Sequence, residues 1–253
     1  MMPCTAGRGA VIRSEGGLRF VDSPTPGRRY TNAQLDDYAH LPRSRFPWSP
    51  PVALTVRARF SHDAGALRGT AGFGFWNDPF AMAGPRRWSL PRAIWFFFAS
   101  RPSDMALALD VPGAGWKAAT LDAWRWPFLA LAPTAPVGFL LMRRRWLYRR
   151  LWPVAQAAMG VSERLLQVDM TQWHTYRIEW GVRQARFLVD GIPVLADACS
   201  PGGRLGCVLW IDNQSMVVTP QGRLRHGLLA TTEQQWMEVS DLEIGIESSR
   251  FHT

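Results

Sequence analysis

Residues 173–180 read WHTYRIEW, residues 181–197 read GVRQARFLVDGIPVLAD, and residues 201–214 read PGGRLGCVLWIDNQ. Polar and apolar residues alternate along the first run, which is the period of a half-buried strand. Asp190-Gly191 is a strong signal for a two-residue hairpin, and it separates a strand RFLVD from a strand IPVLAD. The stretch therefore predicts an antiparallel β-meander.

Strand patterns of the same kind lie on both sides of this meander. VALTVRARF (52–60) alternates cleanly between apolar and polar positions. GTAGFGFWND (69–78) alternates small and aromatic residues, and glycines inside a strand mark close approach of a ligand or another backbone. AIWFFFAS (93–100) is apolar on both faces, which is typical of a central, covered strand. Further strands are expected at MALALD (105–110), SMVV (215–218) and QQWMEVSDLEIGIES (234–248), the last with a bulge near Ser240-Asp241.

Two parts of the chain lack a strand pattern. TPGRRYTNAQLDDY (25–38) is rich in turn formers and is predicted to be a loop. Residues 116–167 contain an apolar stretch with three prolines and then a basic, helical run. The apolar stretch is shorter than the roughly twenty residues that cross a membrane. We expect a largely helical insertion at 116–167, and it has three interpretations: a cap on the fold, an interfacial surface, or a lid over a cleft.

The meander resembles the concanavalin A-like lectin/glucanase superfamily, especially its laminarinase-like branch. In that branch, sequence segments similar to W-H-T-Y-x-I-E-W and F-x-V-D-G-x-P-V form strands that run across the back of a β-sandwich. The resemblance implies an all-β fold, a two-sheet antiparallel jelly roll formed by residues 1–253 as a single domain. It also implies that structural calcium is common among relatives, although the sequence names no ligands for it. No metal site and no other cofactor is expected.

The resemblance also says where catalytic residues should be. Laminarinase-like hydrolases carry E-x-D-x-E on one strand, which places carboxylates on one face to flank a glycosidic bond. The corresponding strand here is RAIWFFFAS. Neither of its two phases contains a carboxylate: one is Ala93, Trp95 and Phe97, and the other is Ile94, Phe96 and Phe98. The chain is therefore predicted not to be a standard glycosidase, and the cleft is predicted to be lined by large aromatic residues.

Polar residues at strand ends supply the candidates for chemistry. Asp78, Asp104 and Asp212 are the candidate general acids, because burial in an apolar cavity would raise the pKa of a carboxyl. Each of them also suits an ordinary turn or strand end, and His174 also suits a histidine packed between sheets. The candidate ligand-binding residues are Phe75, Trp76, Asn77, Trp95, Phe97, His174, Tyr176, Asn213 and Gln214.

Two main functional classes follow from these residues. The first is a binder of a hydrophobic isoprenoid, polyketide or lipid-like molecule, which acts on it by acid-catalysed cyclisation, isomerisation or hydration. The second is a non-catalytic, lectin-like carbohydrate-binding module, because aromatic rings also stack on sugars. Whether the protein is an enzyme stays open. A third interpretation is peripheral contact with an anionic membrane through Arg143, Arg144, Arg145, Arg149 and Arg150.

Composition limits the partners and the compartment. The formal net charge is +9, yet Lys117 is the only lysine, so the arginine excess is typical of codon bias as much as of a polyanionic partner. No nucleic-acid-binding signature accompanies the charge, and nucleic acid is not expected. Cys4, Cys199 and Cys207 are an odd number without metal-ligand spacing. No secretory signal is visible at the N-terminus, so a cytoplasmic location, with peripheral membrane contact, is expected.

Overall fold

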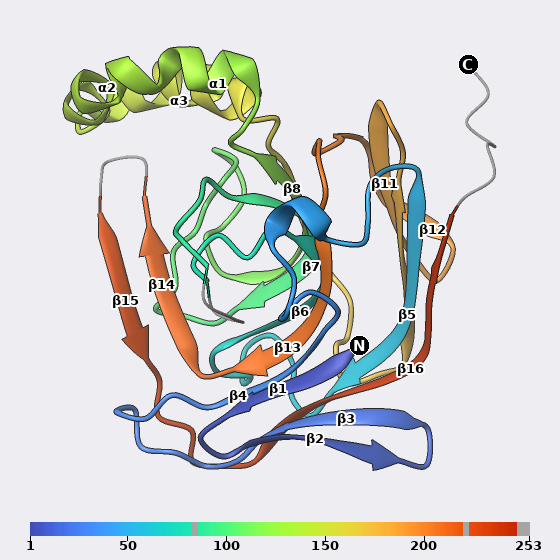
Figure 1. Cartoon of the computed structure of the whole chain (residues 1–253). Helices are drawn as coiled ribbons and strands as arrows, with labels where there is room; N and C mark the ends of the chain where they lie inside the picture. Colours follow the sequence, from blue (N-terminus) through green and yellow to red (C-terminus); the bar gives the residue numbers. More distant parts are fainter. Residues whose placement is uncertain (82–85, 220–222, 247–253) are drawn as a thin grey trace.

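Two β-sheets packed face to face form the body of the protein in this computed structural model (Figure 1). The structure describes residues 1–81, 86–219 and 223–246. In spatial order, the first sheet consists of β1 (Met2–Ala6), β4 (Asn32–Asp36), β13 (Gly206–Asp212), β6 (Thr70–Trp76), β7 (Arg92–Ala99), β8 (Gly115–Asp122) and β9 (Ser162–Leu165).

The second sheet packs against the first and pairs its strands in antiparallel fashion. In spatial order it consists of β12 (Ile192–Cys199), β11 (Gln184–Val189), β10 (His174–Trp180), β5 (Val52–Phe60), β16 (Gln235–Gly245), β3 (Gly17–Asp22) and β2 (Gly9–Ser14). A separate hairpin joins β14 (Gln214–Val218) and β15 (Leu224–Leu228). The helical elements are η1 (Arg43–Arg45), α1 (Trp126–Leu131), η2 (Ala132–Thr134), α2 (Ala135–Leu141) and α3 (Arg145–Ala158).

The core lies between the sheets because alternate residues of each strand point into it. On β7, Ile94, Phe96 and Phe98 face inward and are fully buried. The ring of Phe96 lies 5.0 Å from that of Tyr176 on β10 and 5.2 Å from that of Phe187 on β11, so it joins the two sheets. Period-two alternation thus gives the all-β, two-sheet antiparallel sandwich that the sequence predicts.

Several local predictions are confirmed. β5 spans the predicted residues 52–60, and β10, β11 and β12 form the predicted meander. Asp190 and Gly191 have φ angles of 51° and 78°, the left-handed backbone of a tight hairpin turn. The register of β16 against β5 shifts between Ser240 and Glu243, where the bulge is expected. Residues 247 and 248, the predicted end of this strand, lie outside the described residues.

The strand predicted at MALALD (105–110) is wrong, because this segment is a loop. A side chain takes the hydrogen bonds that a neighbouring strand would need. Glu163 Oε2 accepts the backbone amides of Leu107 at 3.1 Å and of Ala108 at 2.9 Å. The segment is thereby fixed as a loop beside β8 and β9.

Two further boundaries differ from the prediction. The stretch 25–38, predicted to be a loop, contains β4, whose outward side chains are the polar Asn32, Gln34 and Asp36; this polarity hides the alternation. The insertion predicted at 116–167 is shorter, because β8 and β9 flank it as strands. Small alanines make the alternation of β8 hard to see in the sequence. Helices occupy only part of the range, from Trp126 to Ala158, and none of the described residues between Pro127 and Leu151 forms a strand.

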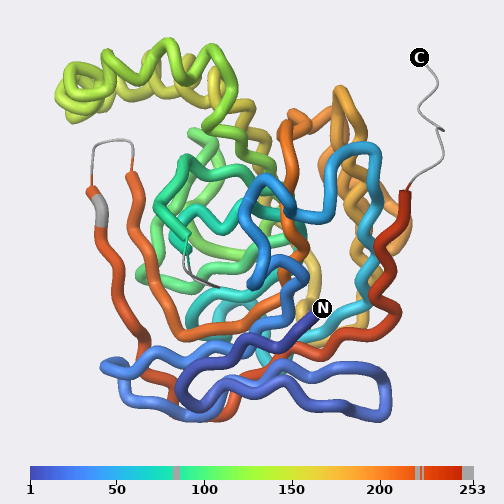
Figure 2. Tube along the Cα trace, viewed as in Figure 1, coloured from blue at the N-terminus to red at the C-terminus, as the bar shows by residue number. Residues whose placement is uncertain are grey.

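The helices form a hairpin, here defined as residues 124–159, that stands beside the sandwich (Figure 2). α1, η2 and α2 run away from the body in one line, and α3 returns beside them. The inner side of this helical hairpin packs Met142, Trp152 and Met159 against Leu107 of the 105–110 loop and Leu121 of β8. Trp152 Nε1 donates a 2.9 Å hydrogen bond to the carbonyl oxygen of Leu107, which fixes α3 to the loop below it.

Candidate functional site

The outer face of the first sheet gathers four aromatic side chains, here called the aromatic face: Trp76, Trp95, Phe97 and Trp210. They come from three neighbouring strands, β6, β7 and β13, and the register places Trp95 opposite Gly74 and Phe97 opposite Gly72. Trp76 and Trp210 are nearly buried, whereas Trp95 and Phe97 are half-buried. The aromatic face is therefore a platform on which the rings of Trp95 and Phe97 reach solvent.

The rings of the aromatic face contact one another. Trp76 and Trp210 lie almost parallel, with centroids 6.4 Å apart, and Trp95 stacks on Phe97 at 5.2 Å. The Trp95 centroid is also 5.6 Å from that of Trp210. Hydrogen bonds fix the two nearly buried rings: Trp76 Nε1 donates to Tyr38 Oη at 2.5 Å, and Trp210 Nε1 donates to Thr70 Oγ1 at 2.9 Å. The platform is preorganised by packing and by these two bonds.

Two glycines of β6 make room for these rings. A Cβ atom at Gly72 would lie 2.9 Å from the Trp210 ring, and one at Gly74 would lie 2.6 Å from Trp95 Cβ. Both positions would also bring a Cβ within 2.4 Å of a backbone oxygen of β7. The small residues predicted from the sequence to mark close approach therefore accommodate neighbouring aromatic side chains and the backbone of β7.

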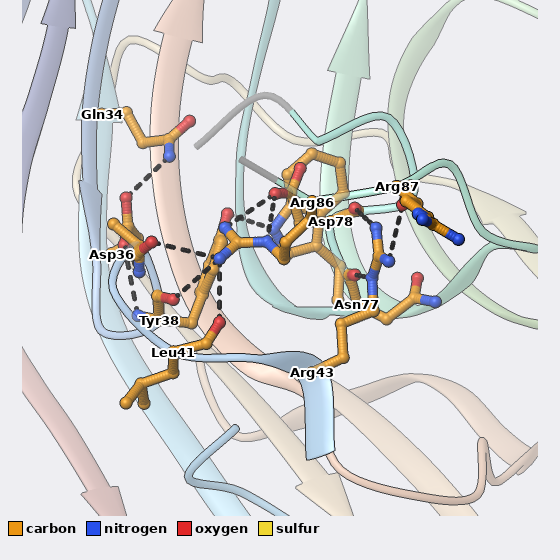
Figure 3. A network of polar contacts seen from close by, with 11 residues as sticks. Gln34, Asp36, Tyr38, Leu41, Arg43, Asn77, Asp78, Arg86 and Arg87 are labelled. Carbon is orange, nitrogen blue, oxygen red and sulfur yellow. Dashed lines mark hydrogen bonds and ion pairs between the residues drawn. The ribbon is translucent and has the colours of Figure 1, made fainter. Parts of the chain in front are cut away.

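A polar margin borders the aromatic face on β4, where Gln34 lies opposite Trp210 and Asp36 lies opposite Val208 (Figure 3). Gln34 Nε2 donates to Asp36 Oδ2 at 2.9 Å. Asp36 Oδ1 accepts the backbone amides of Tyr38 at 3.2 Å and Ala39 at 2.8 Å. Asp36 thus holds the turn that carries Tyr38, and Tyr38 in turn holds Trp76.

Asp78, one of the predicted acids, forms an ion pair with Arg86 at 2.9 Å (Figure 3). Its carboxylate is fully buried, and Arg86 also donates to the carbonyl oxygens of Tyr38, Ala39 and Leu41. The adjacent Asn77 bonds backbone groups of Leu90 and Arg92. These contacts give Asp78 and Asn77 structural partners that fasten residues 86–92 to the Tyr38 turn.

Asp212, another predicted acid, lies at the end of β13 and is almost fully buried. Its Oδ1 accepts Thr70 Oγ1 at 2.8 Å and the backbone amide of Gln214 at 3.0 Å. Burial is the main cause that raises the pKa of Asp212 to about 7, against which these hydrogen bonds act. The neighbouring Asn213 bonds backbone groups of Arg29, Thr31 and Leu229 and so ties three loops together.

We expect the stability of the protein to depend on pH through Asp212. Its raised pKa means that the folded state favours the protonated carboxyl. The stability that this group contributes is complete below its unfolded pKa of about 4 and is lost as pH rises through about 7. Urea unfolding across this window should therefore show Asp212→Asn gaining stability relative to wild type as pH rises. The exposed Asp241→Asn is the control, and a difference that does not vary with pH would contradict the expectation.

The other predicted site residues lie apart from the aromatic face. Phe75 faces the core between the sheets, because neighbours on a strand point to opposite sides, so it cannot line one cavity with Trp76. Tyr176 is also in that core, and His174 continues its row at the margin, bonded to Asp190 at 2.6 Å. Asp104 is exposed and forms a backbone bridge with Val217 on β14.

The predicted aspartates do not converge on one cavity. Trp76, two residues before Asp78, pairs with Gly206, whereas Asp212 pairs with Thr70 at the other end of the same strands. Six residues of strand separate these ends by roughly 20 Å. Gln214 is half-buried and bonds His226. Trp210 is not among the ligand-binding residues predicted from the sequence. Its outward position follows from strand alternation, since it lies between the core residues Leu209 and Ile211.

A hollow of about 550 Å³ lies away from the aromatic face, between the loop 105–112 and α3, and is lined by Leu109, Asp110, Arg145, Tyr148 and Arg149. None of the residues predicted to wall a cavity beneath the helical hairpin lines this hollow. Among residues 1–81, 86–219 and 223–246, no group of three or more His, Cys, Asp or Glu side chains could hold a metal ion. The structural calcium ion stays a prediction.

Fold and site define an all-β sandwich with an aromatic outer face. Similar solved structures include a GlcNAcα1-4Gal-releasing endo-β-galactosidase from Clostridium perfringens, with 14% identity and a TM-score of 0.46 over 91% of this chain. This chain spans 53% of that enzyme's length. A β-1,3-1,4-glucanase (lichenase) derived from a mouse hindgut metagenome has 11% identity and a TM-score of 0.40, covering 92% of this chain and 80% of its own.

A carbohydrate-binding module, CBM66 from Bacillus subtilis, has 8% identity and a TM-score of 0.39, covering 96% of this chain and 94% of its own. No protein-family model and no curated protein matches the chain. At these identities and TM-scores the likeness concerns the arrangement of strands alone. What those proteins bind or cleave is not carried over by it.

Proposed function

We propose that the aromatic face binds a carbohydrate without cleaving it. The observation that carries this proposal is the half-buried pair Trp95 and Phe97, stacked at 5.2 Å and backed by Trp76 and Trp210. Fixed aromatic rings offer a flat apolar surface for a sugar ring. The polar margin of Gln34 and Asp36 lies along one side of it, where both side chains are nearly buried and hydrogen-bonded to each other. Ligand sites are lined mainly by apolar and aromatic side chains, as this face is.

The positions of the carboxylates argue against cleavage. β7 has no acidic residue, and the outward-facing acids of β4 and β13 are Asp36 and Asp212. Val208 pairs with Asp36, four residues before Asp212, so the backbone positions that carry the two carboxylates are separated by roughly 13 Å. Glycosidases place their two carboxyl groups about 5–9.5 Å apart. Both acids are also engaged by backbone amides, which supports a structural role for each.

A hydrophobic small molecule is the second candidate ligand. The observation that favours it is that the indole N–H groups of Trp76 and Trp210 already bond Tyr38 and Thr70, which leaves an apolar platform with few donors. Acid-catalysed cyclisation, isomerisation or hydration of such a molecule stays a prediction. Asp212, with its raised pKa, would be the acid, acting without Asp78 and Asp104.

Trp95→Ala should weaken oligosaccharide binding about 10- to 50-fold, because truncating a central aromatic contact typically costs about 2 kcal/mol. Phe97→Ala should weaken it in the same direction. Isothermal titration with glucan and galactan oligosaccharides, chosen after a glycan-array screen of the wild type, provides the measurement. Products of each oligosaccharide are followed in parallel, and none are expected.

Trp173→Ala is the matched control, because Trp173 is also half-buried but lies beside Arg57 and Arg59 on the other sheet. It should leave binding unchanged. Native mass spectrometry of the purified protein separates the two candidates, since a retained oligosaccharide and a retained lipid-like molecule differ in mass. If the wild-type protein binds no glycan but binds an apolar ligand, and Trp95→Ala weakens that binding, the carbohydrate proposal is wrong and the hydrophobic ligand takes its place.

A further inference from the structure

The outer side of the helical hairpin is strongly apolar and exposed. Among the described residues, eight of the seventeen exposed large apolar side chains lie between positions 124 and 154. Trp126 is 77% exposed, Trp146 is 62% exposed and Leu140 is 61% exposed. The eight are Trp124, Trp126, Val137, Phe139, Leu140, Leu141, Trp146 and Val154. Exposed apolar side chains gathered in this way mark an interaction surface.

The inner side of the same hairpin already has its partners. Met142, Trp152 and Met159 pack on the sandwich, and Arg125 Nη1 near the start of α1 donates to the carbonyl oxygen of Ala157 near the end of α3 at 3.0 Å. Trp124 Nε1 donates to the carbonyl oxygen of Leu90 at 2.9 Å. The hairpin is thus fixed at its base, and its outer side is presented away from the core (Figure 2). Folding of the sandwich does not account for the exposed residues.

The charge of the hairpin is as uneven as its hydrophobicity. Residues 123–162 contain six arginines and no aspartate or glutamate. Three of the arginines, Arg143–Arg145, are consecutive and exposed at the tip, between Leu141 and Trp146. Arg145 and Arg149 also line the hollow that contains Asp110, which is the acidic group beside them. The surface therefore combines aliphatic and indole side chains with net positive charge.

We infer that the outer side of the helical hairpin docks the protein peripherally on an anionic lipid membrane. Exposed tryptophans suit the boundary between headgroups and acyl chains, and arginines among them suit anionic headgroups. A nucleic acid or an acidic protein would use the arginines but would leave Leu140, Leu141 and Val137 in water. Within the described part of the chain, no helix is long and apolar enough to cross a membrane. The hairpin therefore lies on the bilayer surface, with its apolar side chains inserted.

Vesicle co-sedimentation of the full chain tests this inference. The probes are vesicles of phosphatidylcholine alone and of phosphatidylcholine mixed with phosphatidylserine, at low and high salt. Wild type should bind the mixed vesicles at least about tenfold better than the neutral ones, and high salt should reduce this preference. Trp126→Ser with Trp146→Ser, and separately Arg143→Gln with Arg144→Gln and Arg145→Gln, should each weaken binding about tenfold or more.

The matched control is Val182→Ser with Arg183→Gln, an exposed apolar residue and an exposed arginine in the turn between β10 and β11. This variant should bind like wild type. Equal binding to both vesicle types, or equal losses in the control, would overturn the inference. So would a lipid-free dimer that the Trp variants abolish, because the surface would then belong to a second copy. Binding of oligosaccharide by the same variants is expected to be unchanged, so failure here is distinguishable from failure of the aromatic-face proposal.

Discussion

Lys117→Met should lower the free energy of unfolding by about 3–5 kcal/mol, because it would leave a buried carboxylate without its cation. Lys117 Nζ lies 2.7 Å from Glu163 Oε1, and the side chains are 1% and 2% exposed. The ammonium also donates to the carbonyl oxygen of Pro112 at 2.8 Å. Urea unfolding followed by circular dichroism measures the change.

The matched control is Arg164→Met, which removes an exposed cation from the neighbouring strand β9, next to Glu163, and should change stability by less than about 0.5 kcal/mol. The double variant Lys117→Met with Glu163→Met should recover part of the loss, because no buried charge is left. A loss below about 1 kcal/mol in Lys117→Met would contradict a buried ion pair at this position.

The Lys117 variant has a second expected effect, on the helical hairpin. Glu163 holds the amides of Leu107 and Ala108, and the carbonyl oxygen of Leu107 accepts the indole N–H of Trp152 on α3. The ion pair thus supports the loop on which the hairpin rests. Limited proteolysis within residues 126–158 should be faster in Lys117→Met than in Arg164→Met.

Much of the sandwich could be predicted because its strands obey a simple period. β5, β7 and β10 alternate side chains between a buried and an outer face, and the outer side chains of β7 include Trp95 and Phe97 of the aromatic face, which explains its apolar run. The sequence does not predict β4, because its outer row is polar and its core row is only Ala33 and Leu35. Nor does it predict the loop at 105–110, because the acceptor that fixes it, Glu163, is more than fifty residues away in sequence.

The aromatic face was predictable in part. Trp95 and Phe97 share a phase of β7, and β6 supplies Trp76 beside them. Which aspartates lie near this platform depends on register between distant strands, and the sequence contains no signal for it. Asp78 adds a second obstacle, since its partner Arg86 lies outside the strands, where no periodicity predicts its position.

Arg86→Met should also cost about 3–5 kcal/mol of stability, because Asp78 would lose the cation beside its buried Oδ2. The guanidinium is 8% exposed and additionally donates to three backbone carbonyl groups of residues 38–41. A lysine cannot reproduce this planar set of donors, so Arg86→Lys should recover only part of the loss. Thermal and urea unfolding of both variants give the measurement.

The neighbouring Arg87→Met is the matched control, since the Arg87 side chain is exposed and should be replaceable with little effect. The Arg86 variant should also weaken oligosaccharide binding under conditions where it stays folded. The reason is a chain of contacts: Arg86 holds the Tyr38 turn, Tyr38 Oη accepts the indole N–H of Trp76, and the Trp76 ring lies 5.8 Å from that of Trp95. Unchanged binding in a destabilised Arg86→Met protein would show that the ion pair stabilises the fold without positioning the aromatic face.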